Sequence, residues 1–447
     1  MNFKEIGLHV PEILLPKDGS DMTKWSIVAC DQYTSQPEYW EKTKGLVEDS
    51  PSTLNLILPE VYLDSPREEE LVSEINRNMK KYLDENILAK QKPGFVLVDR
   101  KTSIAPSRKG LVVALDLEQY DFREGSATLI RATEGTIVDR LPPRIKVRKD
   151  APIELPHIMV LIDDPERTVI EPLFEMELEK IYDFELMMKN GHIKGYRIDN
   201  ENILNNVAEK LTKLANPALF NSKYGVKDKA VLLYAMGDGN HSFATAKAIW
   251  EELKKKEGTG EEVMSHPARY ALVELVNLHD EGLEFEPIHR IIFNIDTKDM
   301  FEKMDSFYSA QGSKVSIRTF SSKLEAETAA KKARENNFHA ISFVTRETTG
   351  LLAIKDPRLI LEVATLQSFL DSYLANKQDA KIDYIHGKEV VSELGSIPGN
   401  IGFFLEPMSK HDLFKTIILD SALPRKTFSM GEADEKRFYL ECRKITD

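Results

Sequence analysis

Cysteine is scarce in this chain of 447 residues, which has only Cys30 and Cys442. Two cysteines are too few for the disulfide framework of a small secreted protein, so a reducing compartment fits best. Long apolar runs are also missing: nowhere do 18 apolar residues follow one another, which argues against a membrane span. The first residues contain no basic segment followed by an unbroken apolar stretch, so we expect no signal peptide and a cytoplasmic location.

An excess of positive charge is absent as well. The chain has 60 Lys and Arg against 73 Asp and Glu, a formal net charge of −13. This charge opposes nonspecific attraction to nucleic acid or anionic lipid, although a local basic pocket is compatible with it. We therefore expect neither nucleic acid nor a membrane among the partners.

What the chain does contain is a mixture of strand and helix patterns along its whole length. Helical spacing of apolar residues occurs at 66–90, around 199–216 and near 361–377. Strand patterns occur at 94–99, 110–116, 157–163, 230–236, 269–278, 339–345 and 349–355. The mixture predicts an α/β or α+β fold, and the length predicts more than one lobe. We expect a main region at 1–295, which carries the site, and a C-terminal region at 296–447 that packs on it.

A turn of small and polar residues follows the strand at 230–236 and precedes a helix expected from residue 243; it consists of Gly237, Asp238, Gly239, Asn240, His241 and Ser242. Ser242 is placed to cap the helix, and Gly258 to end it. Unpaired N–H groups at a helix N-terminus attract anions, and glycine lets a ligand approach the backbone closely. Asp238 and His241 could then hold a metal or move a proton. The alternative is an ordinary turn in which both side chains hydrogen-bond locally.

Two further stretches combine arginine with polar side chains. In the first, Glu134 lies between Arg131 and Arg140, where a carboxylate stays ionised and can orient a substrate hydroxyl. In the second, His289 and Arg290 make a charge-assisted pair suited to phosphate or carboxylate. The alternatives are a solvated turn with weak ion pairs and a loop histidine that is a plain hydrogen-bond partner.

A fourth stretch begins where the apolar run 25–29 ends in polar residues, as the C-terminal edge of a strand lining a site would. Asp31 is there a second candidate for a general base. Cys30 has no basic neighbour in sequence that would stabilise a thiolate, so we treat it as a small buried hydrophobe.

These stretches together resemble the bacterial and archaeal domain-of-unknown-function family numbered 1015. Residues 238–246, DGNHSFATA, are similar to its D-G-H-H-R-Y-E-T-A signature, and 277–290 to its N-(x)n-D-x-G-L-x-x-x-P-x-H-R. Residues 131–140 lie where the family has T-(x)n-D-R, and 423–427 look like its closing L-P-x-K-S/T. The order and spacing of the motifs hold from about residue 8 to 430.

The family is distantly similar to the fold of ParB, sulfiredoxin and free serine kinase, in which such a turn grips nucleotide phosphates. The resemblance implies a ParB/sulfiredoxin-like core, with Mg²⁺ on Asp238 and the nucleotide on Gly237, Asp238, Gly239, Asn240, Ser242, Arg131, Arg140, His289 and Arg290. This chain departs from the signature, because Asn240, Ser242 and Ala244 replace its first histidine, arginine and glutamate. The lost arginine removes a bidentate phosphate clamp, so either Arg290, Arg131 or Arg140 substitutes for it or phosphate binding is weak.

The leading hypothesis is a kinase that uses ATP or ADP with Mg²⁺ to phosphorylate a small hydroxylated metabolite, free serine being the first to try. Glu134 or Asp31 would orient or deprotonate the hydroxyl, His241 is a further catalytic candidate, and Arg290 would neutralise developing charge. The alternatives are a nucleotide-binding regulatory protein without turnover and a phosphohydrolase that uses water at the same site. The expected partner is a small-molecule metabolite, and homodimer formation stays open.

Overall fold

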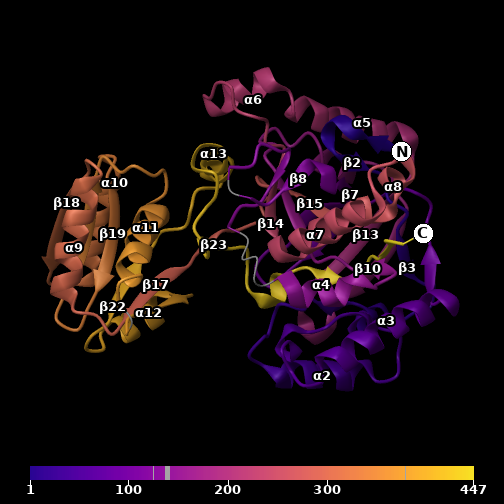
Figure 1. Ribbon diagram of the computed structural model, residues 1–447, viewed down its shortest axis with the longest axis horizontal. Coiled ribbons are helices and arrows are strands. Elements are labelled where there is room, and N and C mark those ends of the chain that lie inside the picture. The colour runs from indigo at the N-terminus through magenta and orange to yellow at the C-terminus, as the bar shows by residue number, and fades with distance from the viewer. Residues whose placement is uncertain (124, 136–140, 378, 447) are drawn as a thin grey trace. The chain divides into compact units, whose positions relative to one another are not determined.

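The structure, a computed structural model, describes residues 1–123, 125–135, 141–377 and 379–446. Two compact units make up the chain: unit 1 is Met1–Glu284 with Met430–Asp447, and unit 2 is Phe285–Ser429. Both units combine helices with β-sheet, which confirms the mixed α/β class (Figure 1). The division at 295/296 stays a prediction about domains, whereas the compact units change at 284/285 and the last residues return to unit 1.

Unit 1 is built on a mixed sheet that has eleven strands among the described residues, in the order β12-β13-β6-β7-β15-β11-β14-β9-β8, with β2 paired to β7 and β1 to β2. β11 runs parallel to β15, and β9 runs parallel to both β14 and β8. The strands are β1 (Asn2–Phe3), β2 (Leu8–His9), β6 (Phe95–Lys101), β7 (Arg108–Asp116), β8 (Tyr120–Asp121), β9 (Ile130–Arg131), β11 (Met159–Ile162), β12 (Lys180–Glu185), β13 (His192–Ile198), β14 (Tyr234–Asp238) and β15 (Tyr270–Asn277).

Helices cover both faces of this sheet (Figure 1). The helices of unit 1 are α1 (Met22–Trp25), α2 (Pro37–Val47), α3 (Glu68–Asp84), α4 (Leu141–Lys149), α5 (Glu201–Leu214), α6 (Pro217–Tyr224), α7 (Asn240–Glu257) and α8 (Glu261–Ser265). Three short antiparallel pairs complete the unit: β3 (Leu14–Pro16) with β5 (Leu88–Lys90), β4 (Ile27–Val28) with β24 (Phe438–Tyr439), and β10 (Ile153–Glu154) with β25 (Arg443–Lys444).

The two faces of the sheet carry separate apolar cores. On β7, Leu111 and Val113 pack into the core that α5 and α7 cover, whereas Val112 packs into the core that α2 and α3 cover. Successive side chains of a strand point to opposite faces, so a strand between two cores is apolar at every position. This is why 94–99 and 110–116 are near-continuous apolar runs in the sequence.

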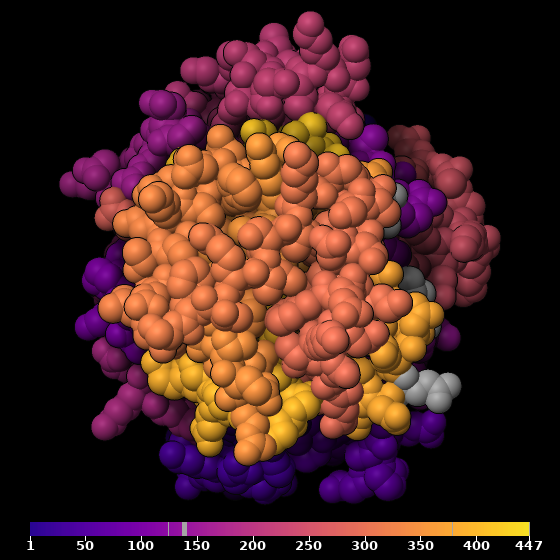
Figure 2. Space-filling model, turned by 90° about the vertical axis from the view of Figure 1, so that its left-hand side faces the viewer, coloured from indigo at the N-terminus to yellow at the C-terminus, as the bar shows by residue number. Residues whose placement is uncertain are grey.

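Unit 2 contains a six-stranded antiparallel sheet within its described residues, in the order β18-β20-β19-β22-β17-β21. Its strands, including the separate pair β16 and β23, are β16 (Glu286–Pro287), β17 (His289–Phe293), β18 (Lys314–Phe320), β19 (His339–Val344), β20 (Thr349–Lys355), β21 (Lys381–Ile385), β22 (Ile401–Phe404) and β23 (Phe428–Ser429). Its helices are α9 (Thr297–Ala310), α10 (Lys323–Arg334), α11 (Glu362–Leu374), α12 (Lys388–Gly395) and α13 (Lys410–Asp420). Figure 2 shows one outer face of this unit in orange.

The C-terminal segment, residues 430–446, belongs to the interior of unit 1. Its strands β24 and β25 pair with β4 and β10, which lie early and midway along the chain. Arg437 is 6% exposed, and its guanidinium contacts Glu274 on β15 at 2.7 Å and Glu441 at 2.8 Å. Buried charges are retained in proteins when they are paired in this way. The segment is therefore fixed in place, and it carries side chains into the site described below.

Most elements expected from periodicity are confirmed, with changes at their ends. α3 and α5 lie within the expected helices, and β6, β7, β11 and β15 correspond to expected strands. The strand expected at 230–236 begins only at Tyr234 and continues to Asp238. Helix α7 begins at Asn240 with Gly239 as its N-cap, so the expectation that Ser242 caps it is wrong, whereas Gly258 does end it. Gly239 moves the start because its φ of 77° turns the chain directly into the helix.

Helices that combine the length and the apolar character needed to cross a bilayer do not occur in the part of the chain that the structure describes.

Candidate functional site

The end of β14 lies beside the start of β11 at one edge of the unit 1 sheet. The two strands are antiparallel, and Asp238 at the end of β14 pairs with Met159 at the start of β11. His157 and Ile158, which precede β11, therefore lie next to the turn that leads from β14 into α7. Asp238, the last residue of β14, and the first turn of α7 lie at this same end of the two strands.

The pair β4 and β24 brings in residues from both ends of the chain. Val28 pairs with Phe438, and the N–H of Ala29 donates to the carbonyl of Arg437 at 3.0 Å. Cys30 and Asp31, directly after β4, therefore lie near the start of β24.

A chain of hydrogen bonds joins these two groups of residues. The hydroxyl of Tyr439 donates to Cys30 Sγ at 3.0 Å, and its oxygen accepts from the Cys30 N–H at 3.3 Å. The same oxygen lies 2.8 Å from Nδ1 of His157. Because the one phenol proton is directed at the sulfur, Nδ1 of His157 is the donor in that contact. On the other side of the ring, Nε2 lies 3.4 Å from Ser242 Oγ and 3.6 Å from Asp31 Oδ2.

The charges of this group shift the titration of its members. Burial by itself lowers the pKa of His157, which is 5% exposed, but the charge and hydrogen bond of Asp31, with Asp238 and Glu60, outweigh it and leave the pKa raised. For Asp31 burial acts upward, yet the His157 ring, Gln32 and Lys436 hold the pKa of its carboxyl well below its usual range. The two residues therefore behave as an ion pair in which His157 keeps its proton to a higher pH than an ordinary histidine.

Cys30 is not an activated nucleophile. Burial, followed by the negative charges of Asp31 and Glu60, raises the pKa of its thiol far above the ordinary value. A thiolate is needed for nucleophilic attack, and this environment opposes it. Cys30 is half-buried, so the expectation of a small buried hydrophobe is wrong in its burial, whereas the expected absence of thiolate chemistry agrees with the raised pKa.

The turn from β14 into α7 is fixed by Asp238 and Gly239. One carboxylate oxygen of Asp238 accepts from the N–H of Gly239 at 2.8 Å, and the other lies 3.4 Å from Nζ of Lys436. A Cβ on Gly239 would lie 3.0 Å from Cα of Ile158. Gly239 therefore permits a close approach to the chain's own backbone at Ile158. The sequence had led us to expect a close approach to a ligand.

The first turn of α7 is open to a ligand in one respect. Gly239, as its N-cap residue, provides no side-chain hydrogen bond to the helix, and the first helical hydrogen bond is donated by Phe243 to Gly239 O. The N–H groups of residues 240–242 carry the positive end of the helix dipole, where anions are stabilised. Asn240 Oδ1 is buried and has no hydrogen-bond partner within the described residues.

A cavity of about 130 Å³ borders this turn. The side chains of Ser242 and Thr245 reach it from α7, and those of His157, Cys30 and Tyr439 reach it from the hydrogen-bonded group. The remaining lining comes from Leu56, Ile57, Leu58, Glu60, Leu63, Met79, Arg144, Val147, Arg148, Ala151, Ile153, Glu154, Leu155, Pro156 and Ile158. Of the turn at 237–242 that the sequence singled out, Ser242 lines the cavity, whereas Gly237, Asp238, Gly239, Asn240 and His241 lie outside the lining.

The residues expected from the 131–140 stretch are only partly in this region. Glu134 follows β9, and because β9 is parallel to β14 it lies at the same edge of the sheet as Asp238, though outside the cavity lining. Arg131 donates to the carbonyls of Thr128 and Ala230 at 2.9 and 2.8 Å, and burial lowers its pKa. That guanidinium is engaged with backbone, which favours a structural role. Arg140 lies outside the described residues.

His289 and Arg290 belong to unit 2 and are engaged within it. Nδ1 of His289 accepts from the N–H of Leu405 at 3.1 Å, and burial with nearby cations lowers its pKa to about 4. Arg290 is 0% exposed and donates to Gln367 Oε1 at 2.8 Å and to the carbonyl of Ile288 at 2.6 Å. An uncharged histidine and a fully buried arginine favour a structural role here as well, so their phosphate contacts stay a prediction.

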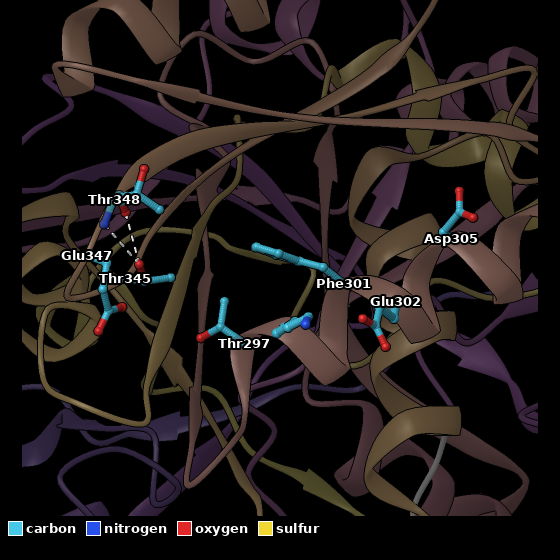
Figure 3. A pocket seen from close by; sticks show the side chains of 8 residues that line it. Thr297, Phe301, Glu302, Asp305, Thr345, Glu347 and Thr348 are labelled. Carbon is cyan, nitrogen blue, oxygen red and sulfur yellow. Dashed lines mark hydrogen bonds between the residues drawn. The ribbon is translucent and has the colours of Figure 1, made fainter.

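Unit 2 has a hollow of its own, of about 700 Å³, between α9 and the turn at 345–348. Figure 3 shows the side chains of these two segments around it, with Thr345 and Thr348 hydrogen-bonded to each other. Glu302, Asp305 and Glu347 make this lining acidic. An acidic surface opposes a nucleotide phosphate, so the unit 1 cavity is the better candidate.

Three residues of the unit 1 site were not expected from the sequence: His157, Lys436 and Tyr439. His157 was identified only as the start of a strand pattern. The sequence did contain a signal for His157. If the strands expected at 157–163 and 230–236 pair as antiparallel neighbours, the start of the first lies beside the end of the second, and so beside the turn at 237–242. Lys436 and Tyr439 lie about 400 residues from Asp31 along the chain, and nothing local indicates that pairing.

A family profile described as "Protein of unknown function (DUF1015)" matches residues 14–373. This finding confirms the family resemblance seen in the sequence. No curated protein matches the chain.

Solved structures with a similar fold were also found. A conserved hypothetical protein from Pyrococcus furiosus has 13% identity and a TM-score of 0.35, with 75% of this chain and 95% of that one covered. Free serine kinase in complex with AMP has 11% identity and a TM-score of 0.36, with 75% and 91% covered. A mutant of that kinase in complex with ADP has 10% identity and a TM-score of 0.37, with 75% and 92% covered. The chemistry of the present chain has to be argued from its own residues.

Proposed function

We propose a function from the premise that the chain belongs to the DUF1015 family: it is a nucleotide-dependent phosphotransferase that acts on a small hydroxylated metabolite. The observation that carries the proposal is the meeting of three features at one cavity edge. These are the open first turn of α7, the Asp238–Lys436 pair, and the Asp31–His157 pair beside Ser242. The ParB/sulfiredoxin relationship expected from the sequence is part of the proposal.

The first turn of α7 would receive the nucleotide phosphates. The N–H groups of a helix's first turn and the positive end of its dipole stabilise an anion. Lys436 supplies a cation beside the turn, with its Nζ 3.4 Å from Asp238. It would take over part of the charge neutralisation that the family's arginine provides where this chain has Ser242.

Asp238 would hold Mg²⁺ together with the nucleotide. Within the described residues, Asp238 belongs to no group of three side chains that could ligate a metal jointly. Mg²⁺ usually binds through one or two carboxylates while substrate phosphates and water complete its shell. A single carboxylate next to a phosphate site fits that pattern; the ion would supply positive charge to the phosphates, and Lys436 would add a second cation near them.

The acceptor hydroxyl would lose its proton to His157. Nε2 of His157 faces Ser242 and Asp31, and Nδ1 is held by Tyr439, so the ring is oriented with one nitrogen toward the cavity edge. In the transfer, the acceptor oxygen bonds to the terminal phosphorus, the bond to the bridging oxygen breaks, and the nucleotide leaves with one phosphate fewer. The neutral form of His157, present above its raised pKa, would take the hydroxyl proton on Nε2, and Asp31 would stabilise the imidazolium that forms. Glu134 and His241 remain alternative proposed bases.

Purified protein incubated with ATP or ADP, Mg²⁺ and a panel of hydroxylated compounds tests the proposal. Phosphorylated product that requires both nucleotide and acceptor supports it. Loss of nucleotide without acceptor identifies a phosphohydrolase, and binding without turnover identifies a regulatory protein; either outcome overturns the kinase proposal. His157→Gln is the matched variant, because it keeps the size of the side chain and removes the base, and it should abolish transfer while nucleotide binding persists.

A further inference from the structure

The wall of the unit 1 cavity is largely apolar. Most of its hydrophobic lining residues belong to the core that α2 and α3 cover, where Leu56, Leu58, Met79 and Ala151 are buried. An apolar wall accepts hydrocarbon: an engineered cavity of about 150 Å³ lined by aliphatic and aromatic side chains binds benzene. At about 130 Å³, the present cavity is close to that size.

The charged side chains in the lining are already paired with one another. Arg144 donates to Glu60, and Arg148 contacts Glu154 at 2.5 Å. The two arginines are one turn apart on α4, and each finds its carboxylate on another segment of unit 1. A zwitterion that entered the cavity would have to compete with these existing pairs, of which Glu154 is held by Arg443 as well, at 2.7 Å. A hydrocarbon group would leave both pairs intact.

The uncharged polar groups of the lining are concentrated where α7 begins. Thr245 Oγ1 donates to a backbone carbonyl of its own helix, at 2.7 Å from His241 O. Among the described residues, the hydroxyl of Ser242 has only the longer contact of 3.4 Å to His157 Nε2. A ligand hydroxyl at this end of the cavity could therefore join that contact, while the rest of the ligand lies against apolar side chains.

From this arrangement we propose that the cavity binds the apolar part of the acceptor, and that the acceptor is an alcohol carrying a branched-alkyl or aryl group of about the size of benzene, not free serine. That the bound alcohol is the acceptor of a phosphoryl group rests on the proposed function. The binding of an apolar alcohol in the cavity follows from the lining alone.

Binding is measured by titration calorimetry of the full chain with benzyl alcohol, isobutanol and L-serine, without nucleotide. We expect benzyl alcohol and isobutanol to bind at least tenfold more tightly than serine. Ala151→Leu places three more carbons in the cavity and should lower the affinity for benzyl alcohol at least tenfold. Met79→Leu keeps the side-chain volume nearly constant and should change this affinity less than threefold. Leu58→Ala enlarges the cavity and should shift the preference toward 2-phenylethanol, so the inference stays testable if Ala151→Leu does not fold.

The same compounds as acceptors with ATP or ADP and Mg²⁺ separate the two proposals. If benzyl alcohol binds and responds to Ala151→Leu but no acceptor is phosphorylated, the phosphotransferase proposal fails while the cavity inference stands. If serine is phosphorylated and benzyl alcohol neither binds nor reacts, the cavity inference is overturned while the phosphotransferase stands. Equal affinity of benzyl alcohol for the wild type and for folded Ala151→Leu also overturns the inference, because the ligand would then lie elsewhere.

Discussion

Replacing Arg437 by methionine tests whether the C-terminal segment holds unit 1 together. Methionine keeps most of the volume and removes the guanidinium, which contacts Glu274 at 2.7 Å, Glu441 at 2.8 Å and the carbonyl of Pro156 at 3.0 Å. Both carboxylates are buried, so the variant leaves two charges without their partner. Removing one partner of a buried ion pair costs about 3–5 kcal/mol, and we expect a loss in the free energy of unfolding within that range.

Urea unfolding followed by tryptophan fluorescence measures this loss for unit 1 alone. The three tryptophans of the chain, Trp25, Trp40 and Trp250, are all buried in unit 1. The matched control is Arg123→Met, which removes an exposed guanidinium paired with one carboxylate and should cost far less stability than Arg437→Met.

Adding Glu274→Gln and Glu441→Gln to Arg437→Met should recover most of the lost stability, because the stranded charges are then gone. A loss below about 1 kcal/mol for Arg437→Met would refute the reasoning, since solvent would then be compensating the two carboxylates.

Three further predictions concern the site. In Asp31→Asn the pKa of His157, which lies above its usual value in the wild type, should fall, as measured by NMR titration of the ring protons. The ion pair stabilises the folded state below about pH 6.5, and this stabilisation is lost as the pH rises through the raised pKa, so it should be smaller in the variant. An unchanged titration midpoint would exclude Asp31 as the cause of the raised pKa. Gly239→Ala should cost more stability than Gly258→Ala in thermal unfolding, because both residues have positive φ but only at Gly239 does the added Cβ meet backbone; equal losses would contradict this packing. Tyr439→Phe should lower kcat at least tenfold with little change in nucleotide affinity, since it removes the group that orients His157, and an unchanged kcat would exclude that positioning role.

The fold follows from the sequence where local patterns determine it. The apolar spacing of 66–90 predicts α3, and the unbroken runs at 94–99 and 110–116 predict β6 and β7, because strands between two cores are apolar on both faces. The ends of elements were less predictable. A strand pattern at 230–236 does not indicate that the chain pairs only from Tyr234, since that depends on the position of β9 and β11.

The sequence predicted only those parts of the candidate site that depend on short local patterns. The turn at 237–242 and Asp31 were identified because polar residues follow apolar runs there. His157, Lys436 and Tyr439 join them through strand pairings between distant parts of the chain, and neither composition nor periodicity encodes such pairings. For Arg131 the sequence showed a charge among polar neighbours, whereas the structure shows that backbone carbonyls occupy it.

The central claim is that the turn between β14 and α7 binds the phosphates of a nucleotide. Calorimetric titration of ATP and ADP, each with Mg²⁺, into the wild type and into Asp238→Asn tests it most directly. The account predicts that the dissociation constant rises at least tenfold in Asp238→Asn, a loss of about 1.4 kcal/mol or more. An unchanged dissociation constant in a variant that unfolds at the same urea concentration as the wild type would contradict it.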